Sequence, residues 1–336
     1  MLKAAVAGLG AISPVHLDIL SHSRDVTLAA VCDCKPEKRN TVEGAAFYTD
    51  VERMLEQEKP DVLHICLPHH LHAPVAAMAA RRGIHVFMEK PPALCCEELQ
   101  TLYGLEERYG VKIGVCLQNR YNQTTQTLRR ALQEDHAGPL RGCKAVLTWN
   151  RTPAYYANDP WRGKTAQAGG GVMLSQAIHL LDLMTWFCGT PAAVRGTVGN
   201  LVHSDIEVED TAMAQIEFPD GVTGIFYGSV GYSRDADVEL ELDCGQTVYR
   251  ICDKKLWRIS AAGQELLAED TPIHSGKAYY GSGHREAIHR FYQAVRTGSR
   301  DYITLQDAAA CMKLIDGITA SSRQAAKIFI TGKDTE

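Results

Sequence analysis

The feature that most constrains this chain is its first sixteen residues, where a short apolar run ends in two closely spaced glycines. Gly8 permits a tight turn, and Gly10 lets backbone amides approach a ligand without an intervening Cβ. The following residues suit a helix, whose first N–H groups attract anions, so the stretch predicts a pyrophosphate cradle formed with Ala11 and Ile12. Ser13 replaces the third glycine of G-x-G-x-x-G and is small enough to keep the helix close to the strand. By itself the motif is equally consistent with an ordinary strand-turn-helix corner.

An acidic residue follows at the distance that a dinucleotide site requires. A second apolar run ends at Asp33, roughly 20 residues past the glycines, where a carboxylate accepts hydrogen bonds from the adenosine ribose. A carboxylate there repels a 2′-phosphate, which favours NAD as the cofactor. Lys38 and Arg39 leave NADP open, because either side chain could reach a 2′-phosphate. The alternative is that Asp33 only caps the next turn.

Length and composition bound the class of protein. The chain has 336 residues, more than the roughly 250 to 300 at which a single core stops growing, so we expect two domains. A net charge of −5 argues against nucleic acid or an anionic membrane as partner. The 11 cysteines are scattered without a C-x-x-C pair, which predicts buried reduced thiols and no metal site. The N-terminus lacks a signal-peptide pattern, so we expect a cytoplasmic protein.

Residues 1–120 alternate apolar runs with helical stretches, which predicts a doubly wound parallel sheet, the Rossmann type of α/β domain. The expected strands are Lys3 to Gly8, Thr27 to Asp33, Val62 to Leu67, His85 to Glu89 and Lys112 to Leu117. The expected helices are Pro14 to Leu20, Pro36 to Gly44, Val51 to Glu56, Ala73 to Arg82 and Cys96 to Tyr109. Ligands bind at the carboxyl ends of such strands. The expected cofactor contacts there are Leu67, Pro68, His69, His72, Glu89, Lys90 and Gln118, with Arg120 and Tyr121 as supporting or substrate contacts.

Residues 121–336 have a different pattern, because most of their apolar segments alternate polar and apolar residues with period two. This predicts an α+β domain with a large, mainly antiparallel open sheet. Helices are expected over Asn122 to His136, Val172 to Phe187, Arg285 to Arg296 and Leu305 to Ala325. We expect the second domain to bind substrate and to be closely joined to the first, with a cleft between them.

Lys90 is the first candidate catalytic residue. It follows an expected strand and precedes Pro91 and Pro92, which fix φ and hold the lysine on a rigid turn. A cation there can hydrogen-bond a substrate hydroxyl and stabilise the alkoxide that forms as the proton leaves. A lysine alone is usually an ordinary surface residue, but its position beside the predicted nicotinamide site favours catalysis.

A second candidate site follows a glycine triplet at residues 169–171. Ser175, His179 and Asp182 lie at positions i, i+4 and i+7 and form one polar stripe on an otherwise apolar helix. A histidine can accept a hydroxyl proton at neutral pH, and a carboxylate one turn away can orient it. The alternative is a core histidine satisfied by a buried neighbour.

A third group lies in a segment before the glycines. Its aromatic rings and guanidinium groups suit a polyhydroxylated ring, and they suit ordinary loop packing equally well. The residues are Arg151, Tyr155, Tyr156, Trp161 and Arg162.

Four motifs, in this order and spacing, resemble the Gfo/Idh/MocA oxidoreductase family, named for glucose-fructose oxidoreductase and inositol dehydrogenase. They are Gly8 to His16, Leu67 to Pro74, Glu89-Lys90-Pro91 and Gly169 to Asp182. The resemblance implies hydride transfer between NAD(P) and a sugar, cyclitol or related alcohol. It also implies catalytic roles for Lys90 and His179, and a homodimer or homotetramer assembled through the C-terminal sheet.

The chain departs from this family at Ser175, where many members have aspartate, so His179 would rely on Asp182, on Lys90 or on the substrate. Three functions therefore stay open. The first is an NAD-dependent dehydrogenase of a sugar, polyol or glycoside. The second is a redox-neutral glycoside hydrolase that oxidises a hydroxyl transiently with bound NAD, and the third is a non-catalytic ligand sensor on the same fold.

Overall fold

The computed structural model describes residues 1–134, 138–271 and 283–330. The chain forms two compact units. The first contains residues 1–118 and 272–308, and the second contains residues 119–271 and 309–336. We predicted a boundary after residue 120, close to the first crossing point, but the segment that follows residue 271 belongs to the first unit.

The first unit is built on a parallel sheet, as predicted. Within the described residues this sheet has six strands in the order β3-β2-β1-β4-β5-β6. Their bounds are β1 Leu2–Ala7, β2 Val26–Cys32, β3 Ala46–Tyr48, β4 Val62–Ile65, β5 His85–Met88 and β6 Ile113–Val115. All four residues of β4 are buried, since a central parallel strand is covered on both faces. Strand β3, which has three residues and no fully buried position, was not predicted from the sequence.

Helices flank this sheet, and two expectations about them were wrong. The helices are α1 Ser13–Ser21, α2 Val51–Glu58, α3 His72–Ala80, α4 Cys96–Gln100, α5 Leu105–Tyr109 and α10 Gly283–Thr297. The helix expected from Pro36 to Gly44 is only a 3₁₀ turn, Pro36–Lys38, with no buried residue to anchor it. The helix expected from Cys96 to Tyr109 is divided at Gly104, whose φ of 76° ends regular helix geometry.

Helix α10 returns from late in the sequence to complete the first unit. Gly114 on β6 leaves room for the ring of Phe291 on α10, because a Cβ at residue 114 would lie 2.6 Å from that ring. The hydroxyl of Tyr292, also on α10, lies 2.9 Å from Nε2 of His64 on β4. These contacts explain why residues 272–308 belong with the N-terminal sheet.

The second unit is built on a large sheet that is mainly antiparallel, as predicted. In the part of the chain that the structure describes, its nine strands are ordered β14-β13-β12-β11-β7-β10-β9-β8-β15, and only β7 and β10 pair in parallel. The bounds are β7 Gly142–Thr148, β8 Ala193–Gly199, β9 Thr211–Glu217, β10 Thr223–Ser229, β11 Glu239–Asp243, β12 Thr247–Cys252, β13 Lys255–Ser260, β14 Gly263–Glu269 and β15 Ile328–Phe329. Strand β14 was not predicted from the sequence, because its largely exposed residues carry little apolar alternation, and neither was the two-residue strand β15.

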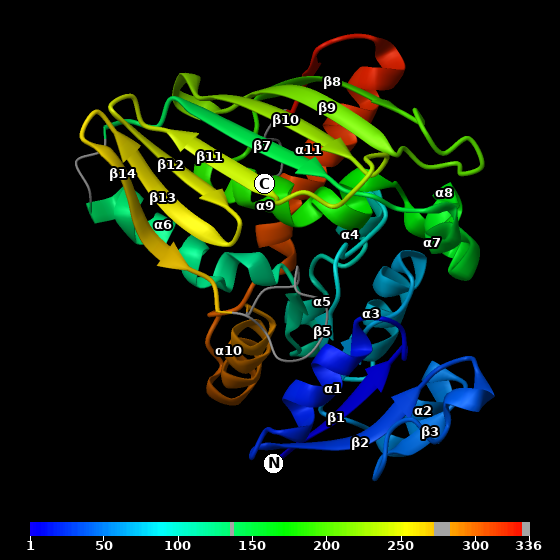
Figure 1. Cartoon of the computed structure of the whole chain (residues 1–336). Coiled ribbons are helices and arrows are strands. Elements are labelled where there is room, and N and C mark those ends of the chain that lie inside the picture. The colour runs from blue at the N-terminus through cyan, green and yellow to red at the C-terminus, as the bar shows by residue number, and fades with distance from the viewer. Residues whose placement is uncertain (135–137, 272–282, 331–336) are drawn as a thin grey trace. The chain divides into compact units, whose positions relative to one another are not determined.

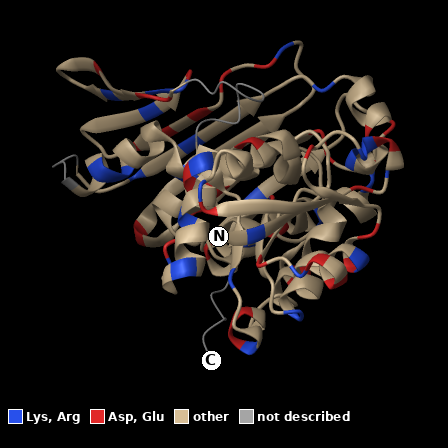
Figure 2. Ribbon diagram, turned by 90° about the horizontal axis from the view of Figure 1, so that it is seen from below, with Lys and Arg blue, Asp and Glu red and all other residues tan. Residues whose placement is uncertain are grey.

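Helices α6, α9 and α11 lie along one face of this sheet (Figure 1). The unit's helices are α6 Gln123–Glu134, α7 Pro153–Asn158, α8 Thr165–Ala168, α9 Ile178–Cys188 and α11 Leu305–Gln324. On the opposite face β9 and β10 expose Met213 and Ile225, at 48% and 56% of their surfaces. Figure 2 shows acidic and basic residues interspersed along the chain.

Candidate functional site

The glycine turn after β1 has the geometry that the sequence predicts. Gly8 has a φ of +94°, and a Cβ at residue 8 would lie only 2.3 Å from the carbonyl oxygen of Cys66 at the end of the neighbouring strand. Gly10 is exposed, and a Cβ there would meet no atom within 4 Å. Gly8 is therefore required by the fold, whereas nothing in the described fold requires Gly10.

Helix α1 follows the turn with its N-terminus uncapped by any side chain. Its N-cap is Ile12, and Ser13 directs its hydroxyl back to the carbonyl oxygen of Gly10, at 2.9 Å. Ala11 is exposed and Ile12 is half-buried. Pro14 has no N–H and the Val15 N–H donates to the Ile12 carbonyl oxygen at 3.0 Å, so the glycine turn and the uncapped helix start together fit a pyrophosphate group.

Asp33 lies at the end of β2 and organises the loop around it. One carboxylate oxygen accepts hydrogen bonds from the Leu9 N–H, at 2.9 Å, and from Lys38 Nζ, at 2.8 Å. The other accepts from the Lys35 N–H, at 3.0 Å. Burial alone raises the pKa of Asp33, but these donors hold it below its usual value, so the group is a carboxylate.

Lys38 and Arg39, the two cations that left NADP possible as the cofactor, contact other groups of the protein. Lys38 Nζ also donates to the carbonyl oxygen of Leu9, at 2.8 Å, and the guanidinium of Arg39 lies over the ring of Phe47. Both side chains therefore contribute to the structure of the loop.

The turn that carries Lys90 is held by buried neighbours. Nδ1 of His72 lies 2.7 Å from the carbonyl oxygen of Pro91, and its Nε2 lies 2.7 Å from that of Leu67. The carboxylate of Glu89 lies 3.0 Å from Nε2 of His16. Lys90 itself is half-buried.

The remaining residues predicted at these strand ends differ in burial. His69 and Gln118 are buried, whereas Leu67 and Pro68 are half-buried. Oε1 of Gln118 lies 3.7 Å from the Cys116 thiol. Glu89 is also buried, and its carboxylate contacts His16 inside this unit.

In the second unit, the predicted polar stripe begins within an irregular helix start. A π-helical turn, Met173–Ala177, precedes α9, so Ser175 lies in this π-turn and His179 in the first turn of α9. Both side chains are half-buried, whereas most of their neighbours in these two segments are buried. A π-helical turn inside a helix is frequent at functional sites. Ser175 and His179 are thus two polar residues of this mostly buried segment that keep some exposure, although the atoms Ser175 Oγ and His179 Nδ1 are themselves buried.

The glycine triplet allows the beginning of this helix to pack closely against the segment that contains Glu209. A Cβ on Gly171 would lie 1.8 Å from the carbonyl oxygen of Glu209. The side chain of Glu209 accepts hydrogen bonds from the N–H groups of Gly171 and Met173, at 2.8 and 3.1 Å. Glu209 was not among the residues predicted from the sequence, since it lies 38 residues after Gly171.

Asp182 is fully buried and binds Arg120. The ion pair is bidentate, with Nε to Oδ2 at 2.9 Å and Nη2 to Oδ1 at 2.6 Å. The guanidinium of Arg120 also lies over the ring of Trp186. Asp182 therefore neutralises Arg120. Tyr121, next to Arg120, is half-buried.

The aromatic segment is tied to the π-turn. Gln176 Nε2 and Arg162 Nη1 both donate to the hydroxyl of Tyr155, each at 3.0 Å. Arg162 also lies over the rings of Tyr155 and Trp161, and Tyr156 packs edge-on against Tyr155. These residues form a cluster beside the turn that carries Ser175.

A glycine turn before a helix N-terminus, followed by an acidic strand end, is typical of a dinucleotide-binding Rossmann domain. The chain belongs to the Gfo/Idh/MocA family: residues 2–117 match its NAD-binding Rossmann domain, described as an oxidoreductase family, and residues 125–249 match its C-terminal domain. These matches confirm the predicted family, the fold class and NAD as cofactor.

Among curated relatives, D-glucoside 3-dehydrogenase of Escherichia coli (strain K12) is 26% identical over 242 residues, which cover 66% of this chain and 68% of the relative. Inositol 2-dehydrogenase of Rhizobium meliloti (strain 1021) is 21% identical and covers 98% and 99% of the two chains. With some other relatives the match spans less of their length, 59% in one case. The solved structure of the WlbA dehydrogenase from Bordetella pertussis, in complex with NADH and UDP-GlcNAcA, has a TM-score of 0.86 at 24% identity and covers 98% of both chains, which shows the same fold.

Proposed function

We propose that this protein is an NAD-dependent dehydrogenase that transfers a hydride between the cofactor and a hydroxyl or keto group of a sugar, cyclitol or glycoside. The observation that carries the proposal is the hydrogen bond from Gln176 to Tyr155, which joins a sugar-compatible aromatic cluster to the turn before His179. The dehydrogenases of a glucoside and an inositol among the relatives support this substrate class.

Two residues carry the proposed chemistry. Lys90, on its rigid turn, donates a hydrogen bond to the substrate oxygen and stabilises the charge that develops on it. His179 accepts the hydroxyl proton, and Ser175, one turn before it, orients the ring or the substrate as an uncharged partner. Bound NAD would supply the hydride acceptor. Gly8 to Ile12 would hold its pyrophosphate, and Asp33 would bind its adenosine ribose, which favours NAD over NADP.

The test is a substrate screen with matched variants. We expect NADH formation, followed at 340 nm, with at least one member of a panel of sugars, nucleotide sugars, cyclitols and aryl glycosides. Lys90→Met and His179→Asn should each lower kcat by roughly a hundredfold or more. Both should bind NADH within about threefold of the wild type, and Lys164→Met, at a surface ion pair with Glu207, should behave as wild type.

Three results would contradict this assignment in different ways. Release of an aglycone without added NAD or net NADH would favour the redox-neutral glycoside hydrolase. Ligand binding without turnover would favour the sensor. Full turnover by Lys90→Met would remove the lysine from the mechanism.

We also propose a cytoplasmic homodimer or homotetramer, assembled through the sheet face that exposes Met213 and Ile225. All eleven cysteines are free thiols, which supports a reducing compartment. Exposed apolar residues on a broad sheet face support self-association. Light scattering of the wild type and of a Met213→Lys, Ile225→Lys variant tests the assembly: a monomeric wild type, or an unchanged variant, would refute this interface.

A further inference from the structure

Five polar side chains form a continuous chain in the interior of the first unit. His284 Nε2 lies 3.7 Å from Glu89 Oε1, and the same oxygen lies 3.0 Å from His16 Nε2. His16 Nδ1 lies 3.0 Å from His64 Nδ1, and His64 Nε2 lies 2.9 Å from the hydroxyl of Tyr292. The chain thus links α10, the end of β5, α1 and β4.

Every member of this chain is almost completely buried, and His16 and His64 are fully buried. The rings of His16 and His64 pack against Phe87, with centroids 5.9 and 5.4 Å away. Polar groups in such apolar surroundings are costly unless each is hydrogen-bonded. Each of these five side chains must therefore have a hydrogen-bond partner, which restricts how donors and acceptors can be arranged among them.

Two proton arrangements satisfy these contacts. In one, His16 is an imidazolium that donates to Glu89 and to His64, whose Nε2 then donates to Tyr292. In the other, His16 is neutral and the hydrogen bonds between His16, His64 and Tyr292 run in the reverse direction. A buried carboxylate needs an opposite charge nearby, and His16 lies closer to the Glu89 oxygen, at 3.0 Å, than His284 does, at 3.7 Å, which favours the imidazolium on His16.

The ionisation of the two partners agrees with this choice. Burial alone lowers the pKa of His16, but Cys66 and Glu89 outweigh it and raise the pKa to about 10. Burial raises the pKa of Glu89, but hydrogen bonds from His16 and His284 hold it well below its usual value. Burial and the nearby charge of His16 lower the pKa of His64, which stays neutral.

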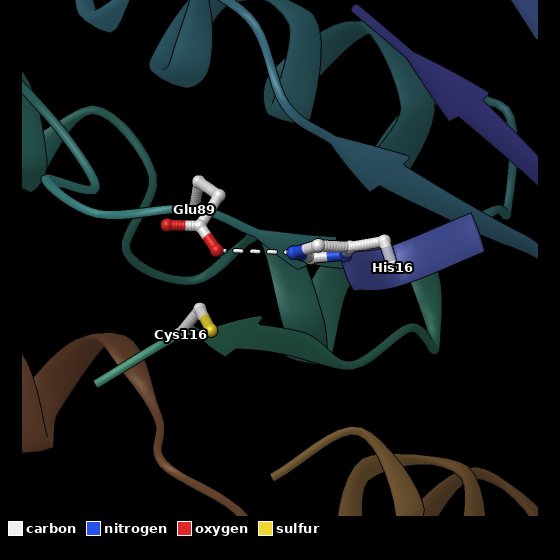
Figure 3. Close-up of side chains that lie close together, drawn as sticks. All are labelled: His16, Glu89 and Cys116. Atoms are coloured by element: carbon white, nitrogen blue, oxygen red, sulfur yellow. Dashed lines mark hydrogen bonds and ion pairs between the residues drawn. The ribbon is translucent and has the colours of Figure 1, made fainter. Parts of the chain in front are cut away.

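The carboxylate that His16 binds belongs to the residue before Lys90. Figure 3 shows the ring of His16 directed at Glu89, with the thiol of Cys116 beside the pair. On the far side of Lys90, His72 contacts the carbonyl oxygen of Pro91. The turn is therefore fixed at both ends, and His16 connects it to the helix whose N-terminus follows the glycine turn.

We propose that His16 is a positioning residue for Lys90: its two ring nitrogens donate to Glu89 and His64, and this fixes the Glu89-Lys90-Pro91 turn. The inference rests on the proposed function only for the catalytic role of Lys90. The arrangement itself can be measured without a substrate.

The first test uses the wild-type protein with ¹⁵N-labelled histidine. The expected NMR spectrum shows both nitrogens of His16 protonated at pH 8, and His64 protonated at Nε2 only. The His16→Gln variant assigns the His16 signals. A His16 with one bare nitrogen would overturn the proposal, as would stoichiometric zinc on His16, Glu89 and Cys116, whose ligand atoms lie within 4.8 Å of one another.

The second test compares His16→Gln with His16→Leu. The glutamine side chain keeps a donor for Glu89, whereas the leucine side chain fills similar space without one. After a short pulse of acetic anhydride, peptide mass spectrometry should show Lys90 acetylated at least threefold faster in His16→Leu, because the half-buried turn loosens. The rate of Lys90 acetylation in His16→Gln should remain within twofold of the wild-type rate. The acetylation rates of Lys38 and Lys112, measured in the same samples, are internal controls.

Activity separates this proposal from the proposed function. Once a substrate is known, the kcat of His16→Leu should be at least tenfold below that of the wild type, and the kcat of His16→Gln should be close to it. The Kd of NADH should stay within threefold of the wild-type value in both variants. His22→Gln, on an exposed histidine after the same helix, is the matched control. Equal Lys90 acetylation in the wild type and His16→Leu would refute the positioning role, whereas absence of any turnover in the wild type would refute only the proposed function.

Discussion

Arg120 and Asp182 form a bidentate ion pair in the interior of the second unit, with 6% and 0% of their surfaces exposed. The pair joins the residues that follow the first unit to the helix that carries His179. Because both charges are buried, either one alone would lack an opposite charge and would be poorly solvated.

We expect Asp182→Asn to lower the free energy of unfolding by about 3 to 5 kcal/mol, since it leaves the Arg120 guanidinium buried without a counter-charge. Urea unfolding followed by circular dichroism measures this. Glu207→Gln removes a surface ion pair with Lys164 and should leave the midpoint unchanged. If Asp182→Asn left the unfolding midpoint as unchanged as Glu207→Gln does, the buried ion pair would contribute little to stability.

Gly171 should tolerate no larger residue. Gly171→Ala places a Cβ 1.8 Å from the Glu209 carbonyl oxygen, so either the π-turn or the Glu209 backbone must move. We expect a loss of about 3 kcal/mol or more in the free energy of unfolding. Gly10→Ala, where a Cβ meets no atom within 4 Å, is the control, and its stability should change by less than about 0.5 kcal/mol.

Asp33→Ala should weaken NADH binding by roughly tenfold or more, because a charged hydrogen-bond acceptor for the ribose is lost. The preference for NADH over NADPH should narrow at the same time, since the substitution removes the repulsion of a 2′-phosphate. Fluorescence titration with both cofactors measures the two constants. Lys38→Ala removes the ion pair but keeps the carboxylate, so it should retain the preference for NADH. Unchanged NADH affinity in Asp33→Ala would exclude the ribose contact.

The His16 ion pair predicts a pH dependence of stability. Its pKa is 6.5 in the unfolded chain and about 10 in the folded protein, so the folded state binds the proton more tightly. The stabilisation is complete below pH 6.5 and is lost as the pH rises toward 10. The difference in unfolding free energy between the wild type and His16→Gln should shrink by about 1.4 kcal/mol per pH unit in this window. Urea titrations at pH 6.5, 8 and 9.5 test it, and a constant difference would mean that His16 is neutral.

Local sequence patterns predicted both sheets, because strand periodicity depends on near neighbours. The predicted helical stripe of Ser175, His179 and Asp182 is interrupted, since Ser175 lies in a π-turn and Asp182 is fully buried. Local patterns could not predict the partners of these residues. Arg120 lies 62 residues before Asp182, and His16 lies 73 residues before Glu89. The π-turn before His179 has no periodic signal of its own, and the short strand β3 offers too few residues for alternation to be detected.

Helix α10 has a consequence for how the protein is synthesised. A ribosome releases the N-terminal 118 residues long before the helix that completes their unit, which begins at Gly283. Until then the ring of Phe291 is missing beside Gly114, and His64 lacks the Tyr292 hydroxyl. The emerging N-terminal sheet therefore stays incompletely covered while strands β7 to β14 of the second sheet are translated, and this interval is when the nascent chain is most exposed to aggregation.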